Sequence, residues 1–192
     1  MGSSPLVHSV HFYDRDEALV SRLHNIVVSS LEGGSSVLIV ATEEHRRQLG
    51  AALKDSERAV EHLTKDRLQM LDARETLSKF MLHGHPSDQR FAATVGKLIA
   101  DARSQANNEH RGLTVFGEMV ALLWGDGNKV AALELERMWN EALHDRSFHL
   151  HCAYPRWILE DNANNLVVKA ICDEHSSVFG YAPRIPHPAG IN

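Results

Sequence analysis

Short strand-like runs, either apolar throughout or with polar residues interspersed, alternate along the chain with longer segments in which apolar residues recur every three or four positions. The short runs predict strands. They cover residues 8–13, 37–41, 68–71, 113–116 and 148–154. Because the run from Val37 to Ala41 is apolar at every position, we expect this strand to be buried on both faces.

The longer segments predict amphipathic helices that follow the strands. The clearest helices are expected at residues 88–107, 130–143 and 164–175. Asp14, Thr42 and Asp72 each come directly after a predicted strand. We expect their side chains to cap the next helix by accepting hydrogen bonds from its first-turn amides. Glycine and proline interrupt the helical pattern within residues 83–87, which predicts a loop there.

Strands that alternate with helices of this length predict an α/β fold. Right-handed crossovers between successive strands build a mostly parallel sheet with helices on both faces, so a three-layer arrangement is expected. A length of 192 residues fits one domain. We expect residues 1–182 to form that domain and residues 183–192, which are punctuated by proline and glycine, to be a loose tail.

The charge and hydropathy of the chain argue against two large classes of partner. The formal net charge is -5 and no basic run is longer than His45-Arg46-Arg47, so direct binding to nucleic acid is not expected. The longest nearly apolar stretch, residues 113–124, is too short to cross a bilayer, so no membrane partner is expected. The amino terminus lacks the basic and apolar regions of a secretory signal. These features predict a cytoplasmic protein in which Cys152 and Cys172 are free thiols.

Polar or ionisable side chains stand at or just after the ends of the predicted strands. The candidates are Tyr13, His45, Asp72, Glu118, Cys152 and Tyr154, with apolar walls expected from Phe12, Met119 and Trp124. Ligands of open α/β sheets bind at the carboxyl ends of the strands, so these residues are expected to converge on one crevice. Asp72 is explained equally well as a helix cap. A role as a helix cap does not explain Glu118. This residue interrupts an apolar stretch, and a buried carboxylate needs a partner or a ligand.

Several kinds of catalytic site are not indicated by the sequence. The first strand is followed by Asp14, Asp16 and Glu17 without glycine or lysine, so a phosphate-binding loop for ATP is absent. The nucleophile elbow of the α/β-hydrolases is absent as well. The 13 histidines form none of the established metal-binding motifs, although His149 and His151 share one face of a strand and Cys152 faces the other. We therefore expect no catalytic residues, no metal and no cofactor.

Eight blocks of the sequence are similar to the MEDS sensory domain and occur in the family's order over about residues 6–178. The blocks are His11-Phe12-Tyr13-Asp14, Val40-Ala41-Thr42 with His45, Leu71-Asp72-Ala73 with Leu77 and Phe80, Phe116-Gly117-Glu118-Met119-Val120, Gly127-Asn128, Ala132-Leu133-x-Leu135-Glu136 with Trp139-Asn140, Leu150-x-Cys152-Ala153-Tyr154-Pro155 and Ile171-Cys172-x-Glu174-His175-Ser176. The resemblance implies a RecA/KaiC-like fold without a phosphate-binding loop. It also implies a sensor of small hydrocarbon derivatives, of the kind found attached to histidine kinases, DNA-binding domains or anti-sigma-type regulators.

Three hypotheses for the function follow from these observations. The first is a non-enzymatic sensory domain that binds a small organic ligand in prokaryotic signal transduction, including the regulation of transcription. The second is an interaction module that regulates a histidine kinase or an anti-sigma-type partner without a small ligand. The third is an enzyme that uses Cys152 or a histidine-bound metal. RecA-like proteins assemble, so the resemblance also allows a homo-oligomer. No output domain is recognised in the sequence, which is consistent with a stand-alone sensor or an excised domain.

Overall fold

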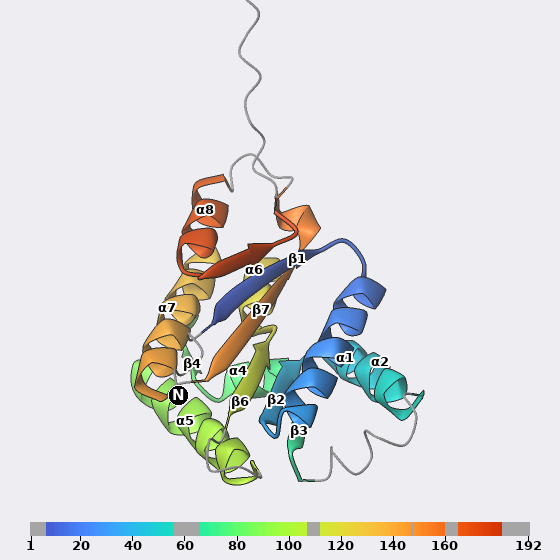
Figure 1. Cartoon of the computed structure of the whole chain (residues 1–192). Coiled ribbons are helices and arrows are strands. Elements are labelled where there is room, and N and C mark those ends of the chain that lie inside the picture. The colour runs from blue at the N-terminus through green and yellow to red at the C-terminus, as the bar shows by residue number, and fades with distance from the viewer. Residues whose placement is uncertain (1–6, 56–65, 107–111, 147, 160–164, 182–192) are drawn as a thin grey trace, which may run out of the picture.

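A parallel sheet forms the middle layer of the computed structural model, which describes residues 7–55, 66–106, 112–146, 148–159 and 165–181 (Figure 1). Its strands are β1 (His8–Tyr13), β2 (Ser36–Ala41), β3 (Leu68–Asp72), β6 (Leu113–Gly117), β7 (His149–Pro155) and β8 (Ser177–Phe179). They are arranged in the order β3-β2-β6-β7-β1-β8, and each neighbouring pair is parallel. The predicted parallel sheet is therefore confirmed.

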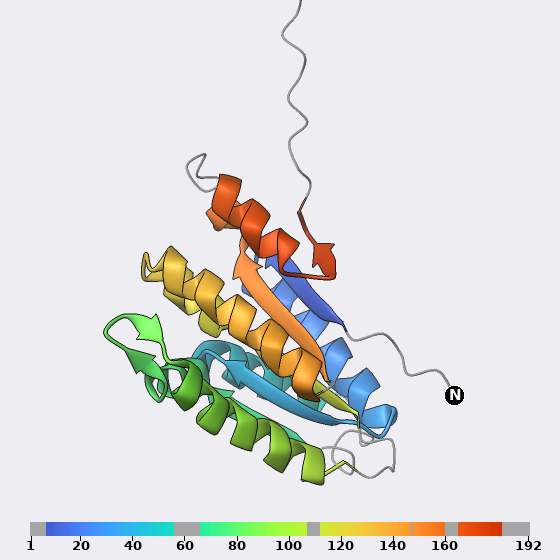
Figure 2. The same ribbon diagram turned by 90° about the vertical axis from the view of Figure 1, so that its left-hand side faces the viewer.

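Helices cover both faces of the sheet, as Figure 2 shows in a view turned by 90°. One face carries α1 (Asp16–Glu32) and α2 (Glu43–Asp55); the other carries α4 (Ala73–Ser78), α5 (Asp88–Ser104), α6 (Met119–Gly125), α7 (Lys129–Arg146), the 3-10 helix η1 (Arg156–Leu159) and α8 (Asn165–Asp173). The crossovers through α1 and α2 step toward β3, whereas the later ones step toward β8. Right-handed crossovers require opposite faces for opposite directions, so the predicted three-layer arrangement is confirmed. The narrower RecA/KaiC-like assignment stays a prediction.

Each face of the sheet has its own apolar core, because successive side chains of a strand point to opposite faces. On β1 and β7, Phe12, Cys152 and Tyr154 pack into the larger core beneath α5, α6 and α7. Tyr13 and Ala153, each next in the sequence to one of them, pack into the smaller core beneath α1 and α2. Residues that are adjacent in the sequence are thus separated by the thickness of the sheet.

The central strand and two of the three predicted caps are confirmed. All six positions of β2 are buried. The Thr42 hydroxyl accepts a hydrogen bond from the His45 amide at 3.4 Å, and the Asp72 carboxylate accepts one from the Glu75 amide at 2.9 Å. The prediction for Asp14 is wrong. Helix α1 starts one residue later, after Arg15, and the Asp14 carboxylate instead pairs with Arg156 at 3.3 Å.

Two short elements differ from the sequence prediction. β4 (Met81–Leu82), just before the predicted loop, and β5 (His85–Pro86), inside it, form a small antiparallel hairpin whose turn contains Gly84 at φ 86°. At the other end of the chain, β8 adds an unpredicted strand beside β1. Gly180 ends β8 at φ 74°, and a Cβ atom at this position would lie 2.1 Å from the carbonyl oxygen of Phe12. The predicted tail at residues 183–192 lies outside the described residues.

None of the helices in the described ranges combines the length and the apolar character that a membrane crossing needs.

Replacing Asp72 tests its structural role. We expect Asp72→Ala to lower the free energy of unfolding by about 1 kcal/mol, because the first turn of α4 loses its cap. Asp72→Asn is the matched variant: an asparagine caps nearly as well, so the loss is expected to be clearly smaller. Urea denaturation followed by circular dichroism measures both values. Equal losses in the two variants would assign the effect to the ion pair with Arg46 rather than to the cap.

Candidate functional site

The six side chains that the sequence singles out do not meet in one crevice. Tyr13, His45 and Glu118 lie together at the carboxyl edge of the sheet, beside α1 and α2. Cys152 and Tyr154 lie in the larger core on the other side of the sheet. The prediction that these residues converge on a single crevice is therefore wrong. The reason is the alternation of side chains, which sends Tyr13 of β1 and Tyr154 of β7 to opposite faces.

The first group, which we call the edge cluster, is built around the Glu118 carboxylate. It consists of Tyr13, Asp16, His45 and Glu118. Glu118 Oε1 lies 2.6 Å from His45 Nδ1, and Oε2 accepts a hydrogen bond from the Thr42 amide at 2.8 Å. The other imidazole nitrogen, Nε2, lies 3.4 Å from the Asp16 carboxylate. The Tyr13 ring stands edge-on to the imidazole, with 6.1 Å between the ring centroids.

The edge cluster favours a positive charge on His45. Burial by itself lowers the pKa of this imidazole, but the carboxylates of Glu118 and Asp16 outweigh burial, so its pKa is raised above the ordinary value. Burial and the same two carboxylates raise the pKa of the Tyr13 hydroxyl, which stays neutral. His45 and Glu118 are buried, whereas Asp16 is 52% exposed. The cluster is thus an imidazole, whose raised pKa favours its protonated form, between one buried and one accessible carboxylate.

Asp72 is a neighbour of this edge with a structural role. Its carboxylate caps α4 and also accepts a hydrogen bond from the Arg46 guanidinium at 2.8 Å. The hydrogen bond from the Glu75 amide and the Arg46 charge hold the pKa of Asp72 below its usual value. These contacts account for Asp72 without a ligand.

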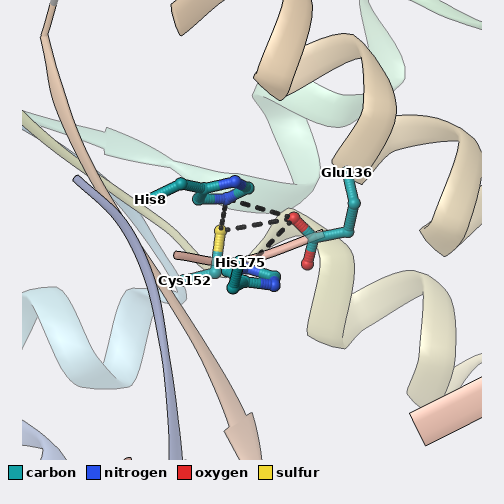
Figure 3. Close-up of side chains that lie close together, drawn as sticks. All are labelled: His8, Glu136, Cys152 and His175. Atoms are coloured by element: carbon teal, nitrogen blue, oxygen red, sulfur yellow. Dashed lines mark hydrogen bonds and ion pairs between the residues drawn. The ribbon is translucent and has the colours of Figure 1, made fainter. Parts of the chain in front are cut away.

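The second group lies in the larger core and brings together four side chains from four different parts of the fold. This buried quartet consists of His8 at the start of β1, Glu136 of α7, Cys152 of β7 and His175, which follows α8 (Figure 3). In Figure 3 the four side chains point toward one another. Their nearest nitrogen, oxygen and sulfur atoms all lie within 4.8 Å of one another.

Glu136 is the centre of the buried quartet. Its Oε2 atom lies 3.4 Å from His8 Nε2, 3.5 Å from His175 Nε2 and 3.6 Å from Cys152 Sγ. Its Oε1 atom accepts a hydrogen bond from the Tyr154 hydroxyl at 2.8 Å. Burial raises the pKa of Glu136, but the two imidazoles and Tyr154 outweigh it, so the carboxyl is ionised. Burial and the Glu136 charge raise the pKa of both Cys152 and Tyr154.

Three members of the buried quartet are not among the residues that the sequence singled out: His8, Glu136 and His175. A usable signal was present for Glu136. It lies between Leu135 and Trp139 on the buried side of the helix, just as Glu118 interrupts its apolar stretch. His175 lies in one of the blocks that resemble the MEDS domain, whereas no such signal marks His8, because only the fold brings it close to the other three side chains.

A shallow hollow of about 160 Å³ lies between α5 and α7. Its walls include Phe91, Val95, Met138 and Glu141. None of its lining residues belongs to the edge cluster or to the buried quartet.

No curated protein matches the chain. A family model matches residues 7–170, which is more than half of the sequence and includes the whole edge cluster and every member of the buried quartet except His175. The family is described as the methanogen/methylotroph, DcmR sensory domain. The chain therefore belongs to the MEDS family of sensory domains.

Proposed function

We propose that this sensory domain binds a small, partly polar organic molecule at the edge cluster, and that occupancy of this site is the signal it transmits. Membership of the MEDS family supports the sensory role. The observation that carries the choice of site is the buried Glu118–His45 pair, with 2.6 Å between carboxylate and imidazole, at the carboxyl edge of a parallel sheet.

The topology supports this location. Strands β2 and β6 are neighbours, but the chain leaves β2 toward α2 on one face and leaves β6 toward α6 on the other. Ligands of open α/β sheets bind where neighbouring strands lead to opposite faces. Thr42 and Glu118, the first residues after these two strands, are joined by a hydrogen bond of 2.8 Å.

The chemistry of the cluster indicates how such a molecule would bind. Glu118 holds one side of the protonated His45 imidazole, and the other side faces Asp16 at the longer distance of 3.4 Å. A hydroxyl or carbonyl oxygen of a ligand can replace Asp16 as the acceptor of the Nε2 hydrogen, with the Tyr13 ring as an apolar wall. Asp16 is the first residue of α1 and is half-exposed, so it can move away. Binding would then be coupled to a movement at the start of α1, which gives the two states that a signal needs.

Ligand screening on the Glu118→Gln variant tests the proposal. We expect some short-chain alcohols, aldehydes or halocarbons to raise the melting temperature of the wild-type protein. Glu118→Gln is expected to weaken that binding by about 10- to 100-fold, because the amide no longer keeps His45 charged. Glu44→Gln is the matched control, since Glu44 is exposed on α2, the helix that carries His45, and pairs with Arg47. Isothermal titration calorimetry measures the affinities.

Two outcomes would remove the ligand proposal. One is the absence of a response to every probe in the wild-type protein. The other is a response of equal strength in wild type and Glu118→Gln.

A second candidate function is docking to a signalling partner, of the histidine kinase or anti-sigma type, without a small ligand. The observation that favours it is the exposure of two large apolar side chains, Trp157 at 55% and Leu166 at 82%. They belong to η1 and α8, which pack against each other. A signalling output that is lost in Trp157→Ser and kept in Glu118→Gln would favour docking over ligand binding.

The pH dependence of the edge cluster follows from the raised pKa of His45. In the unfolded chain the imidazole titrates at about 6.5. Its stabilising contribution is therefore complete below this pH and is lost as the pH rises through the higher folded pKa. We expect the difference in unfolding free energy between wild type and Glu118→Gln to shrink from about pH 6 to pH 9. Urea denaturation at a series of pH values gives this difference.

A nuclear magnetic resonance titration provides the internal control for this pH prediction. Burial and the charge of Arg22 lower the pKa of His151 to about 4, so its signals should titrate far below those of His45. A His45 midpoint at or below the ordinary value would contradict the prediction.

A further inference from the structure

The geometry points to a transition-metal site, fitted to Zn²⁺, formed by the buried quartet of His8, Glu136, Cys152 and His175. The site lies on the opposite side of the sheet from the edge cluster and does not depend on the proposed ligand. It departs from the expectation that the chain holds no metal.

The spacing of the donor atoms fits one four-coordinate ion. Zinc bonds of about 2.0–2.3 Å at tetrahedral angles place neighbouring donor atoms about 3.3–3.6 Å apart. The Glu136 Oε2 atom lies 3.4, 3.5 and 3.6 Å from the donor atoms of His8, His175 and Cys152. The distance from Cys152 Sγ to His8 Nε2 is 3.5 Å. Four of the six distances between donor atoms are therefore already close to those in a tetrahedral zinc complex.

Both imidazoles are held in the form that binds a metal through Nε2. The Nδ1 atom of His175 lies 2.6 Å from the carbonyl oxygen of Ile171, which can only accept, so Nδ1 carries the hydrogen. The Nδ1 atom of His8 lies 2.7 Å from Asn140 Oδ1. The orientation of this amide is fixed because its nitrogen donates to the backbone and side-chain oxygens of Glu174. Second-shell acceptors of this kind are the usual companions of metal-binding histidines.

The Glu136 carboxylate is also oriented for single-oxygen coordination. The Tyr154 hydroxyl occupies Oε1 at 2.8 Å, which leaves Oε2 to face the two imidazoles and the thiol. A divalent ion bound by one carboxylate, one thiolate and two neutral imidazoles forms a site with no net charge. Neutrality suits a position where Glu136 and the His175 side chain have no exposed surface.

Hydrogen bonding among the four side chains does not satisfy them equally well. The Nε2 atom of His175 is buried and has no hydrogen-bond partner in the part of the chain that the structure describes. Its ring lies against that of His8, with 4.0 Å between the centroids. Burial lowers the pKa of His175, which disfavours a second proton on it. A metal ion would accept the lone pair of His175 Nε2, and the Cys152 thiol would lose its proton to solvent when the ion binds.

Metal analysis of the wild-type protein is the first test. The full-length chain is produced with zinc in the medium, freed of loosely bound metal on a chelating resin and analysed by mass spectrometry. We expect about one zinc ion per chain. Because the site is buried, the protein is also unfolded with chelator and refolded with Zn²⁺ or Co²⁺. Refolding with Co²⁺ is expected to give the thiolate charge-transfer band and the intense visible bands of a tetrahedral complex.

Variants assign the metal to the quartet. Cys152→Ser should abolish the charge-transfer band, whereas Cys172→Ser, which changes the other thiol outside the quartet, should keep it. Tyr154→Phe preserves the shape of the core and removes only the hydrogen bond to Glu136, so it should weaken zinc binding by about 10- to 100-fold. Tyr13→Phe in the edge cluster is its matched control and should bind zinc as wild type does.

The outcomes separate this proposal from the preceding one. Absence of stoichiometric zinc after expression and refolding, together with absence of cobalt bands, overturns the metal site even if no variant folds. Equal zinc affinity in Tyr154→Phe and wild type overturns the assignment to the quartet. Glu118→Gln should keep its zinc, so a failure of ligand binding at the edge cluster leaves the metal result unaffected.

Discussion

Two carboxylates, Glu118 and Glu136, are enclosed in the apolar interior, and the arrangement around them follows from the need to compensate each charge. Glu118 is met by an imidazole and a backbone amide, which joins β6 to the segment between β2 and α2. Glu136 is met by two imidazoles, a thiol and a phenol, which joins α7 to β1, β7 and the end of α8. Removing Glu118 would leave the His45 imidazole without its counter-charge, and removing Glu136 would leave the buried Tyr154 hydroxyl without its acceptor.

The alternation of side chains along parallel strands keeps the two centres apart. The neighbours Tyr13 and Phe12 of β1 face different cores, and so do Ala153 and Tyr154 of β7. The domain therefore carries one centre at the rim of the sheet, within reach of solvent, and a second one enclosed in the larger core. The first has an accessible carboxylate, Asp16, and the second has none.

Much of the fold was predictable because short strand-like runs are followed by segments in which the apolar residues recur every three or four positions. The strand β8 was missed because three residues, two of them exposed, carry too little pattern. Asp14 does not cap α1 because the helix begins one residue later than predicted, which makes Arg15 the N-cap. The edge cluster was partly predictable from strand ends. The buried quartet was not predictable as a cluster, because His8 and His175 are 167 residues apart and only the fold brings their rings together.

The short strand β8 also affects how readily the edge of the sheet could pair with other chains. It pairs with Ser9, Val10 and His11 of β1, so that a strand of only three residues forms this edge of the sheet. A long unpaired edge strand is a template for pairing with other chains, and a very short one blunts the edge. The chain can leave β8 close to the backbone of Phe12 only because Gly180 has no side chain. The protection of this border against aggregation therefore depends on the absence of one methyl group.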